Sequence, residues 1–347
     1  MTPERAIGGE LEIGPADFCI DGGQSAWPLL AGKYELRCDS GRTALLLALV
    51  DWRKRRPKSL RAWVPSYVCE SLILAVHAAG YSIAWYDDRP ARGLLRGIAP
   101  ARDDIVIVIH YFGFPNAILA ELLEGRAETP YGIVEDCVQA LYTKDVGVEG
   151  DYAISSLRKW WPAPDGAAVY AKQEISEHLS GADEEFVSMR SAAKLLRGAG
   201  LCEARYLNWV EESENSLKPI PRQCSWLSTK LLESVPRDVA CARRRDNWSI
   251  LNKGLGGIDG LKPLFEDLPD QVVPLAFPVT VGGERRDQLR DHFRKHRIFC
   301  PVHWPATADW PDESRRLSGD ILSLPIDQRY DGVDMERILR ATRDFFS

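Results

Sequence analysis

The stretch DDIVIVIHYFG, residues 103–113, decides the fold class. Five β-branched residues follow one another from Ile105 to Ile109, between Asp104 and Gly113. β-Branched side chains favour strands, and an apolar run without alternation is typical of a strand buried on both faces of a parallel sheet. We therefore expect a parallel sheet with helices on both of its faces.

The segments on either side of this strand repeat the order strand then helix. Strand patterns occur at RAWVPS (61–66), SIAWYD (82–87), YGIVED (131–136), DYAISS (151–156) and AAVYA (167–171). Helical patterns occur at GRTALLLALVDWRKRR (41–56), ESLILAVHAAG (70–80) and NAILAELLEGRA (116–127). This alternation predicts an α/β fold with a largely parallel sheet.

The second half of the chain, from about residue 175, has a different pattern. Residues 175–255 are mainly helical, and three strand patterns follow at QVVPLAFPVTV (271–281), RIFCPV (297–302) and ILSLPI (321–326). The glycine-rich segment GLGGIDGLKPL (254–264) lies between the two regions and is the best linker candidate. We therefore expect a large domain over residues 1–255 and a smaller α+β domain over residues 256–347.

Composition excludes several classes of function. Among 347 residues, 44 Lys and Arg stand against 50 Asp and Glu, and a net charge of −6 argues against a nucleic-acid binder. No apolar run approaches the roughly 18 to 20 residues of a membrane span, and the N-terminus lacks a signal-peptide pattern. The eight cysteines, without a C-x-x-C pair, indicate reduced thiols, and the histidines show no metal-ligand spacing. We expect a soluble cytoplasmic protein without a metal.

Two segments near predicted strand ends could bind a ligand, because ligands of open α/β sheets lie beyond the carboxyl ends of the strands. Residues 40–43, Ser-Gly-Arg-Thr, precede a helix whose N-terminus could hold a phosphate, although a simple helix cap explains them as well. Glu135 and Asp136 end an apolar strand, with Gln139 three residues later. A carboxylate there needs a partner, and an N-cap is the alternative.

The third segment contains Lys159, which follows Ser155 and Ser156 and precedes two tryptophans. Partial burial would lower the pKa of its amine, as a nucleophile requires, whereas a lysine lying over an aromatic surface is the alternative. Together, a helix start, a strand-end Asp and a Lys after the next strand match the needs of pyridoxal phosphate. The Lys forms the Schiff base, the Asp keeps the pyridine nitrogen protonated, and the helix N-terminus binds the phosphate.

Several motifs occur in the order typical of one known family. They are SGRTALLLAL (40–49), VPSYVCESLILAVHAAG (64–80), IVIVIHYFGFP (105–115), VEDCVQAL (134–141), GDYAISSLRKWWPAPDGAAV (150–169), FCPVHWP (299–305) and LSLPIDQRYDGVDMERI (322–338). With them the chain resembles a divergent member of the DegT/DnrJ/EryC1/StrS family of pyridoxal-phosphate aminotransferases. The resemblance implies the fold-type-I, aspartate-aminotransferase-like architecture.

The resemblance also implies roles for single residues. Lys159 would be the Schiff-base lysine, Asp136 the partner of the pyridine nitrogen, and Gln139 a neighbour of the ring hydroxyl. Further cofactor contacts would come from Gly41, Arg42 and Thr43, from Tyr67 or Cys69 over the ring, and from Ser155 or Ser156 on the phosphate. Apart from the resemblance, His110 at the end of the apolar strand and His303 in FCPVHWP could contact the substrate, and a core or cap role is the alternative for both; Arg222 is a further candidate. The family has a loop that reaches the active site of the partner subunit, and this sequence has no clear counterpart of that loop. Arg222 is named only because it lies in the corresponding segment.

The function implied by the resemblance is transfer of an amino group from an amino acid, often L-glutamate, to a keto-sugar that is nucleotide-linked. Two alternatives remain: amination of a non-sugar carbonyl compound in a specialised biosynthetic pathway, and a cofactor-binding protein without turnover. The arginines 243–245 could bind a substrate diphosphate, although we expect a solvated helix face there. Family members are mostly homodimers involved in polysaccharide or antibiotic biosynthesis, and we expect a homodimer.

Overall fold

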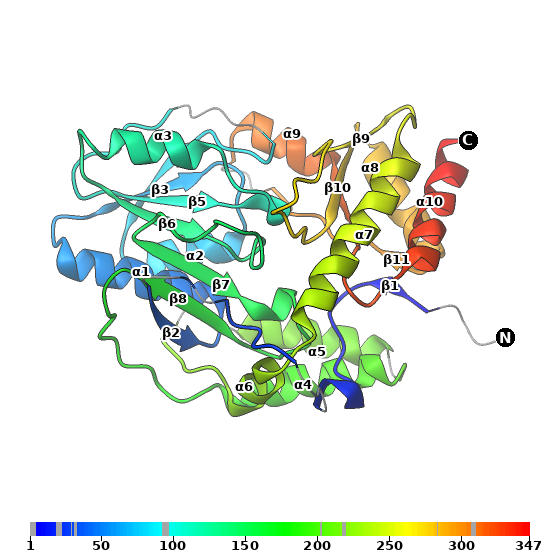
Figure 1. The fold of residues 1–347 in the computed structure, drawn as a ribbon, viewed down its shortest axis with the longest axis horizontal. Coiled ribbons are helices and arrows are strands. Elements are labelled where there is room, and N and C mark those ends of the chain that lie inside the picture. Colours follow the sequence, from blue (N-terminus) through cyan, green and yellow to red (C-terminus); the bar gives the residue numbers. More distant parts are fainter. Residues whose placement is uncertain are drawn as a thin grey trace.

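The computed structural model describes residues 5–18, 23–28, 30, 33–91, 97–201, 203–216, 220–282, 284–306 and 310–347 (Figure 1). Its centre is a seven-stranded sheet in the order β2-β8-β7-β6-β5-β3-β4. The neighbouring strands from β7 to β4 are parallel, whereas β8 is antiparallel to both β7 and β2. The strands are β2 (Tyr34–Cys38), β3 (Arg61–Pro65), β4 (Ser82–Tyr86), β5 (Ile105–Ile109), β6 (Gly132–Asp136), β7 (Tyr152–Ser156) and β8 (Ala167–Ala171).

Strand β5 is buried on both faces, as its sequence predicts. All five residues are buried, and they divide by strand alternation between two apolar clusters. Ile105, Ile107 and Ile109 pack in the cluster that includes α1 (Gly41–Arg55) and α2 (Glu70–Ala78). Val106 and Val108 pack in a second cluster with α3 (Ile118–Gly125). Helices therefore cover both faces of the sheet, and the expected α/β architecture is confirmed.

A second body of structure lies beyond the carboxyl ends of the parallel strands. Helix α7 (Arg237–Leu255) leads into a three-stranded antiparallel sheet of order β12-β10-β9. Figure 1 shows these strands and the last helices on the right of the large sheet. The elements are β9 (Leu261–Pro263), β10 (Phe277–Val281), α8 (Arg285–Lys295), β11 (Ile298–Phe299), α9 (Asp312–Asp320), β12 (Ile321–Leu324) and α10 (Gly332–Phe346). The boundary expected at residue 255 coincides with the end of α7 and stays a prediction.

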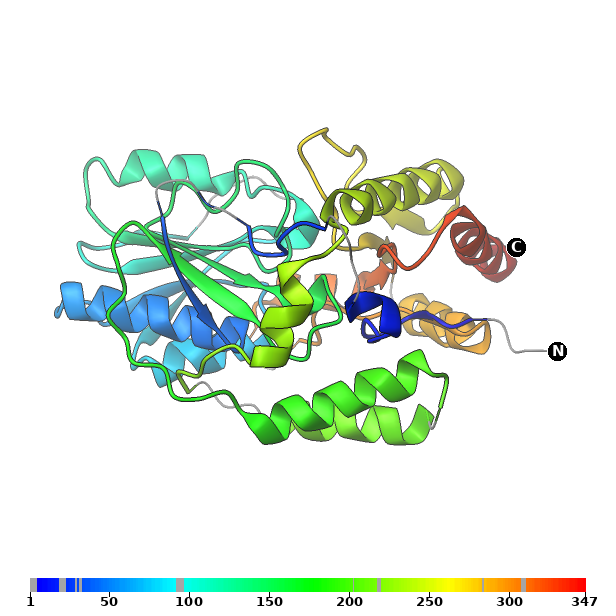
Figure 2. The same ribbon diagram turned by 60° about the horizontal axis from the view of Figure 1, so that its bottom comes forward.

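Three short or peripheral parts complete the fold. Strand β1 (Ile7–Gly8) pairs in parallel with β11, so the N-terminal segment joins the C-terminal body. Helices α4 (Glu184–Gly198) and α5 (Glu203–Ser216) lie side by side below the sheet in Figure 2. The remaining helices are α6 (Trp226–Glu233) and the 3-10 turns η1 (Pro15–Phe18), η2 (Tyr111–Gly113) and η3 (Leu157–Lys159).

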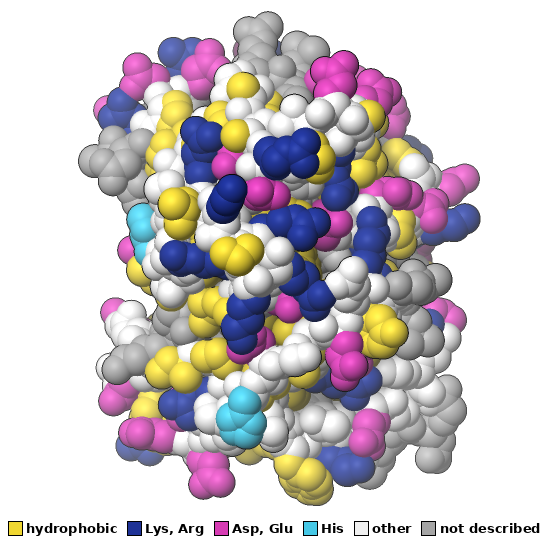
Figure 3. All heavy atoms as spheres, turned by 90° about the vertical axis from the view of Figure 1, so that its left-hand side faces the viewer, with side chains coloured by type: hydrophobic (Ala, Val, Ile, Leu, Met, Phe, Trp, Pro, Cys, Tyr) yellow, Lys and Arg dark blue, Asp and Glu magenta, His cyan; other side chains and the backbone are white. Residues whose placement is uncertain are grey.

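The side of the molecule where α1 ends carries many basic residues. Figure 3 shows this side, with Lys and Arg side chains interspersed among acidic and apolar ones. Lys54 pairs with Glu177, Arg55 with Asp51, Arg56 with Asp103 and Arg61 with Asp104. The basic run near the end of α1 is therefore matched by carboxylates, at the opposite end of the strands from the site described below.

No helix in the described ranges is long and apolar enough to cross a membrane. Of the eight cysteines, six lie in these ranges and all six are free thiols, whereas Cys19 and Cys202 lie outside the described residues. No group of metal-ligating side chains was found within the same ranges.

Candidate functional site

Two cavities meet at Arg158 and Lys159, at the carboxyl end of β7. The first, here called the inner cavity, lies at the sheet edge and is lined by residues that include Ser40, Gly41, Arg42, Cys69, Ser71, Asp136, Gln139, Ser156, Arg158, Lys159 and Trp304. The second, the outer cavity, measures about 480 Å³ and separates the large sheet from the C-terminal body. Lys159 is partly buried and lines both cavities.

The sheet register brings the inner-cavity residues together. Ile109 lies beside Asp136 and Asp136 beside Ile154, so β5 and β6 end at one level, and β7 continues for two more residues to Ser156. Lys159 follows in η3, a turn fixed where the Leu157 N–H donates to the Gly166 carbonyl at 2.9 Å. Gly166 has a φ of +110°, which a residue with a side chain rarely adopts. The turn that carries Lys159 therefore depends on this glycine.

The N-terminus of α1 forms one end of the inner cavity. Ser40 caps the helix by accepting the Thr43 N–H at 3.3 Å. The Thr43 hydroxyl donates to the Ile220 carbonyl at 3.2 Å and is fully buried, so Thr43 does not line the cavity. A Cβ added at Gly41 would lie 3.5 Å from Cβ of Ser156, inside the space between helix and strand. Gly41, Arg42 and Ser156 thus surround the place where a phosphate would meet the helix N-terminus.

The two serines of β7 point in opposite directions, because successive residues of a strand face opposite sides of the sheet. Ser156 lines the inner cavity. Ser155 lies on the other face, where its hydroxyl faces the Ala168 carbonyl at 3.5 Å. Between the two serines that the sequence left open, the geometry favours Ser156 as a phosphate contact.

The two acidic residues at the end of β6, Glu135 and Asp136, also face opposite sides of the sheet. Asp136 faces the inner cavity, and one carboxylate oxygen accepts the Val138 N–H at 2.9 Å. Burial raises the pKa of Asp136, and the Val138 N–H and the charge of Lys159 oppose that shift. Glu135 faces the other way and accepts N–H groups of Gly147, Glu149 and Gly150 at 2.6–2.9 Å. Glu135 therefore holds a loop, and Asp136 is available to a ligand.

Gln139 is buried and partly unsatisfied. Its Oε1 accepts the Phe112 N–H at 2.7 Å, whereas its Nε2 has no partner among the described residues. A buried amide donor without a partner is costly, so an acceptor atom from a ligand is expected beside it.

Of the two residues before α2 that could face the cofactor ring, Cys69 lines the inner cavity and Tyr67 does not. Cys69 lines the inner cavity, with its thiol 3.1 Å from the Ser71 hydroxyl. Tyr67 is fully buried among Tyr111, Trp304 and Trp310 and lines neither cavity. The expectation that Tyr67 contacts the cofactor is not supported, because its ring packs in this aromatic cluster, whereas Trp304 lies at the inner cavity.

A partly buried network of charges adjoins Lys159. Arg158 donates two hydrogen bonds to the Glu214 carboxylate at 3.0 and 3.1 Å, and Arg42 donates a third at 3.0 Å. The pKa of the Glu214 carboxyl is lowered to about 2, and the positive charge of Arg158 is the largest cause of that shift. Glu214 of α5 thereby links the start of α1 to the residue before Lys159.

His303 lines the outer cavity, where a substrate contact is one of the two roles that the sequence allows for it. Its Nδ1 lies 2.9 Å from the Ser323 hydroxyl. Burial, assisted by the charge of Lys159, lowers the pKa of His303 to about 3, so its ring is neutral near pH 7.

His110 and Arg222 lie away from both cavities. His110 is buried, with Nε2 3.0 Å from Glu135 and with Nδ1 accepting the Asn116 N–H at 3.0 Å. Both ring nitrogens are therefore used, and the alternative of a core histidine holds. Arg222 pairs with Asp183 at 3.4 Å and lines neither cavity in this chain.

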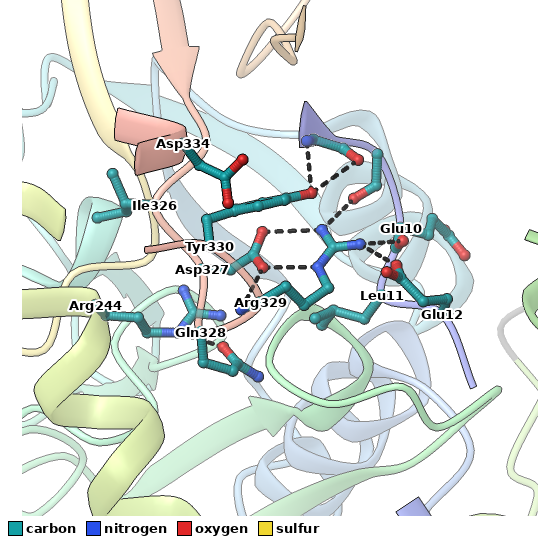
Figure 4. A network of polar contacts seen from close by, with 12 residues as sticks. Glu10, Leu11, Glu12, Arg244, Ile326, Asp327, Gln328, Arg329, Tyr330 and Asp334 are labelled. Carbon is teal, nitrogen blue, oxygen red and sulfur yellow. Dashed lines mark hydrogen bonds and ion pairs between the residues drawn. The ribbon is translucent and has the colours of Figure 1, made fainter. Parts of the chain in front are cut away.

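One wall of the outer cavity comes from the N-terminal segment, which the sequence analysis did not identify. Gly8, Gly9, Glu10 and Leu11 line the cavity. Figure 4 shows Arg329 reaching this segment: it donates to the carbonyls of Gly9 and Glu10 and to the carboxylates of Glu12 and Asp327. Local sequence patterns carry no signal for a contact between residues 320 positions apart.

No family model and no curated protein matches the chain. Solved structures do match. A DegT DnrJ EryC1 StrS aminotransferase from Brucella abortus shares 17% identity over 90% of this chain and 86% of that chain, with a TM-score of 0.60. The sugar aminotransferase CalS13 from Micromonospora echinospora shares 18% identity over 89% and 87%, with a TM-score of 0.61.

Spr1654 from Streptococcus pneumoniae, solved in its pyridoxal-phosphate form, shares 14% identity over 99% of this chain and all of that chain, with a TM-score of 0.67. The chain therefore has the fold of these aminotransferases. The expected fold-type-I architecture is confirmed, and the resemblance found in the sequence agrees with these neighbours.

Proposed function

We propose that the protein is a pyridoxal-phosphate-dependent aminotransferase in which Lys159 is the Schiff-base lysine. The observation that carries this proposal is the convergence of Asp136, Gln139, Ser156 and Lys159 with the N-terminus of α1 on one cavity. The sequence identified these residues separately, and the sheet register brings them to one edge. The fold shared with solved aminotransferases supports the same function.

The inner cavity suits this cofactor in three ways. The helix N-terminus beside Gly41 and Ser156 fits an anionic phosphate. The buried, unpartnered Nε2 of Gln139 fits the ring hydroxyl. The buried Asp136, whose pKa is raised by burial, would gain a cationic partner in a protonated pyridine nitrogen.

The cofactor, when bound, supplies a carbonyl that condenses with amines and a ring that accepts electrons from the substrate α-carbon. Lys159 would hold the cofactor covalently and, once released, would move the proton between the substrate α-carbon and the cofactor C4′. Asp136 would keep the pyridine nitrogen protonated. Ser156 and the α1 N–H groups would fix the phosphate, and Cys69 would lie against the ring.

For the substrates, we propose an amino-acid donor such as L-glutamate and a keto-sugar acceptor that is nucleotide-linked. The outer cavity of about 480 Å³ is large enough for a substrate beyond the cofactor, and Arg290 and Arg294 at its lining suit an anionic one. The likeness to CalS13 supports a sugar. Amination of a non-sugar carbonyl compound remains the second candidate, and screening of acceptors separates the two.

We also propose that the protein is a cytoplasmic homodimer, on the strength of the family resemblance. In such a dimer the segment around Arg222 would be placed near the partner's site. Light scattering after size-exclusion chromatography gives the mass directly, and a mass of one chain would contradict this part of the proposal.

The experiment that tests the function is an absorbance spectrum of the purified protein with pyridoxal phosphate, before and after L-glutamate, beside Lys159→Ala. We expect a visible band that fades with L-glutamate and is absent or altered in the variant. A band that no amino acid changes would support the third hypothesis, a cofactor-binding protein without turnover. Absence of any band in the wild-type protein would contradict the cofactor assignment and leave only the fold.

A further inference from the structure

The three consecutive arginines of α7 have different surroundings. Arg243 is exposed, and Arg245 donates to the Pro269 and Val272 carbonyls at 2.8 and 2.5 Å. Arg244 is only 1% exposed and lines the outer cavity. The expectation of a solvated helix face is therefore wrong for Arg244, and this residue requires a separate explanation.

Two of the three guanidinium nitrogens of Arg244 donate hydrogen bonds to neighbouring residues. Nε donates to Oε1 of Gln328 at 2.9 Å, and Nη1 donates to the Leu275 carbonyl at 2.9 Å. The group also lies 4.5 Å from the ring centre of Trp160, the residue after Lys159. These three contacts hold the guanidinium in one position at the outer cavity.

The third nitrogen, Nη2, is buried and has no partner among the described residues. Figure 4 shows the guanidinium directed from α7 toward the loop of Ile326, Asp327 and Gln328, which borders the outer cavity. The charge of Asp327 acts on Arg244, but both oxygens of that carboxylate bind Arg329. Burial lowers the pKa of Arg244 to about 10, so the group is still a cation near pH 7.

Among the charges that line the outer cavity besides Arg244, Lys159 and Arg290 also have no ion pair in the described ranges, but both are only partly buried, and Arg290 donates to the Cys300 carbonyl at 3.3 Å. The remaining charges at this cavity are paired. Arg158 pairs with Glu214, Arg329 with Asp327 and Glu12, and Arg294 with Asp291, whereas Glu10 pairs with Arg190 and Lys194. No ion pair of Arg244 is found among the described residues. A buried cation without a carboxylate partner is unfavourable, and an anionic ligand would remove that cost.

We propose that Nη2 of Arg244 binds a carboxylate of the amino-acid donor. The inference rests on the proposed function, because it assigns part of the substrate site of the same enzyme. Only one nitrogen is available, so the contact suits one oxygen of a carboxylate, whereas a diphosphate requires several donors. Arg244 and Lys159 line the same cavity, so a carboxylate bound to Nη2 would lie in the cavity that the amine of Lys159 also lines. Arg244 is thus a residue that selects donors with a free carboxylate.

The test is calorimetric titration of the cofactor-loaded protein with glutarate, a dicarboxylate that has no amine and cannot react. We expect Arg244→Gln to weaken glutarate binding roughly tenfold or more, since a charged hydrogen bond is lost. Arg244→Lys, which keeps the charge, should weaken it less. The matched control is Arg243→Gln, the same change at the exposed neighbour, which should leave the affinity within about twofold.

A second measurement avoids any dependence on the variants' folding. The neutral diamide glutaramide should bind the wild-type protein at least tenfold more weakly than glutarate. Equal binding of the two compounds, or unchanged glutarate affinity in a folded Arg244→Gln protein, would refute the carboxylate site. These titrations need no turnover and can be repeated without cofactor. If the absorbance experiment fails while glutarate binding still depends on Arg244, the proposed function is wrong and the carboxylate site remains.

Discussion

Glu135 offers the most quantitative test of how the structure is held around the site. Its carboxylate accepts three backbone N–H groups from the loop of Gly147, Glu149 and Gly150, at 2.6–2.9 Å, and lies 3.0 Å from His110. These contacts outweigh the effect of burial and lower the pKa of Glu135 from 4.5 to about 2. A difference of this size corresponds to ~3 kcal/mol of folding free energy at pH 7.

We therefore predict that Glu135→Gln lowers the free energy of unfolding by ~3 kcal/mol at pH 7. The amide keeps the volume of the side chain, but it places N–H donors against backbone N–H donors. Because the folded pKa lies below the unfolded one, the contribution of the wild-type carboxylate is complete above about pH 5 and is lost as the pH falls toward 2. It should decrease by roughly a quarter between pH 7 and pH 4.

The measurement is urea unfolding of both proteins, followed by tryptophan fluorescence, at several pH values from 4 to 7. Glu149→Gln is the matched control, since that side chain is exposed and only its backbone N–H meets Glu135, and it should change stability by less than about 0.5 kcal/mol. If Glu135→Gln lowers the free energy of unfolding by less than about 1 kcal/mol at pH 7, the proposal that Glu135 stabilises the loop of residues 147–150 is wrong. A difference between the proteins that grows as the pH falls would also contradict it.

Three further predictions concern the cavities. Ser156→Ala should weaken the affinity for pyridoxal phosphate about tenfold, through loss of one hydrogen bond to a charged group, whereas Ser155→Ala should change it less than about twofold; fluorescence titration of the cofactor-free protein distinguishes them. Asp136→Asn should leave cofactor binding measurable. In stopped-flow absorbance, the visible band should fade after addition of L-glutamate at least roughly a hundredfold more slowly than in the wild-type protein. An unchanged rate would remove Asp136 from the proposed mechanism. Arg329→Met should make residues 7–12 accessible to limited proteolysis, because the clamp on the Gly9 and Glu10 carbonyls is lost, and an unchanged digestion pattern would contradict that role.

Local patterns were sufficient for six of the seven strands of the large sheet and for the residues at strand ends, whereas the edge strand β2, whose residues are mostly exposed, was not predicted. The β-branched run of Ile105–Ile109 predicts a strand buried on both faces, and the structure places its residues alternately in two clusters. The same alternation explains the outcome for the acidic pair. Two adjacent residues of a strand cannot both face one cavity, so only Asp136 could reach the ligand while Glu135 faces the loop.

Other parts of the site depend on contacts that no local pattern encodes. Counting residues could not decide between Ser155 and Ser156, because the register of β7 on β8 settles which serine faces the cavity. His110 directly follows β5, and its contacts with Glu135 and Asn116 hold its ring away from both cavities. The wall built by the N-terminal segment results from contacts with residues near the other end of the chain, such as Gly8 with Tyr330.

The charges around Lys159 show why a cation-rich site can be stable before any substrate binds. Glu214 receives hydrogen bonds from Arg42 and Arg158, and the pKa of its carboxyl, lowered to about 2, keeps it ionised at any physiological pH. It therefore balances the positive charge next to the lysine without lining either cavity itself. Arg244 has no such carboxylate among the described residues, and its buried Nη2 is left for a ligand. The contrast between Arg158, which has a carboxylate partner, and Arg244, which has none among the described residues, agrees with the proposed carboxylate site at Arg244.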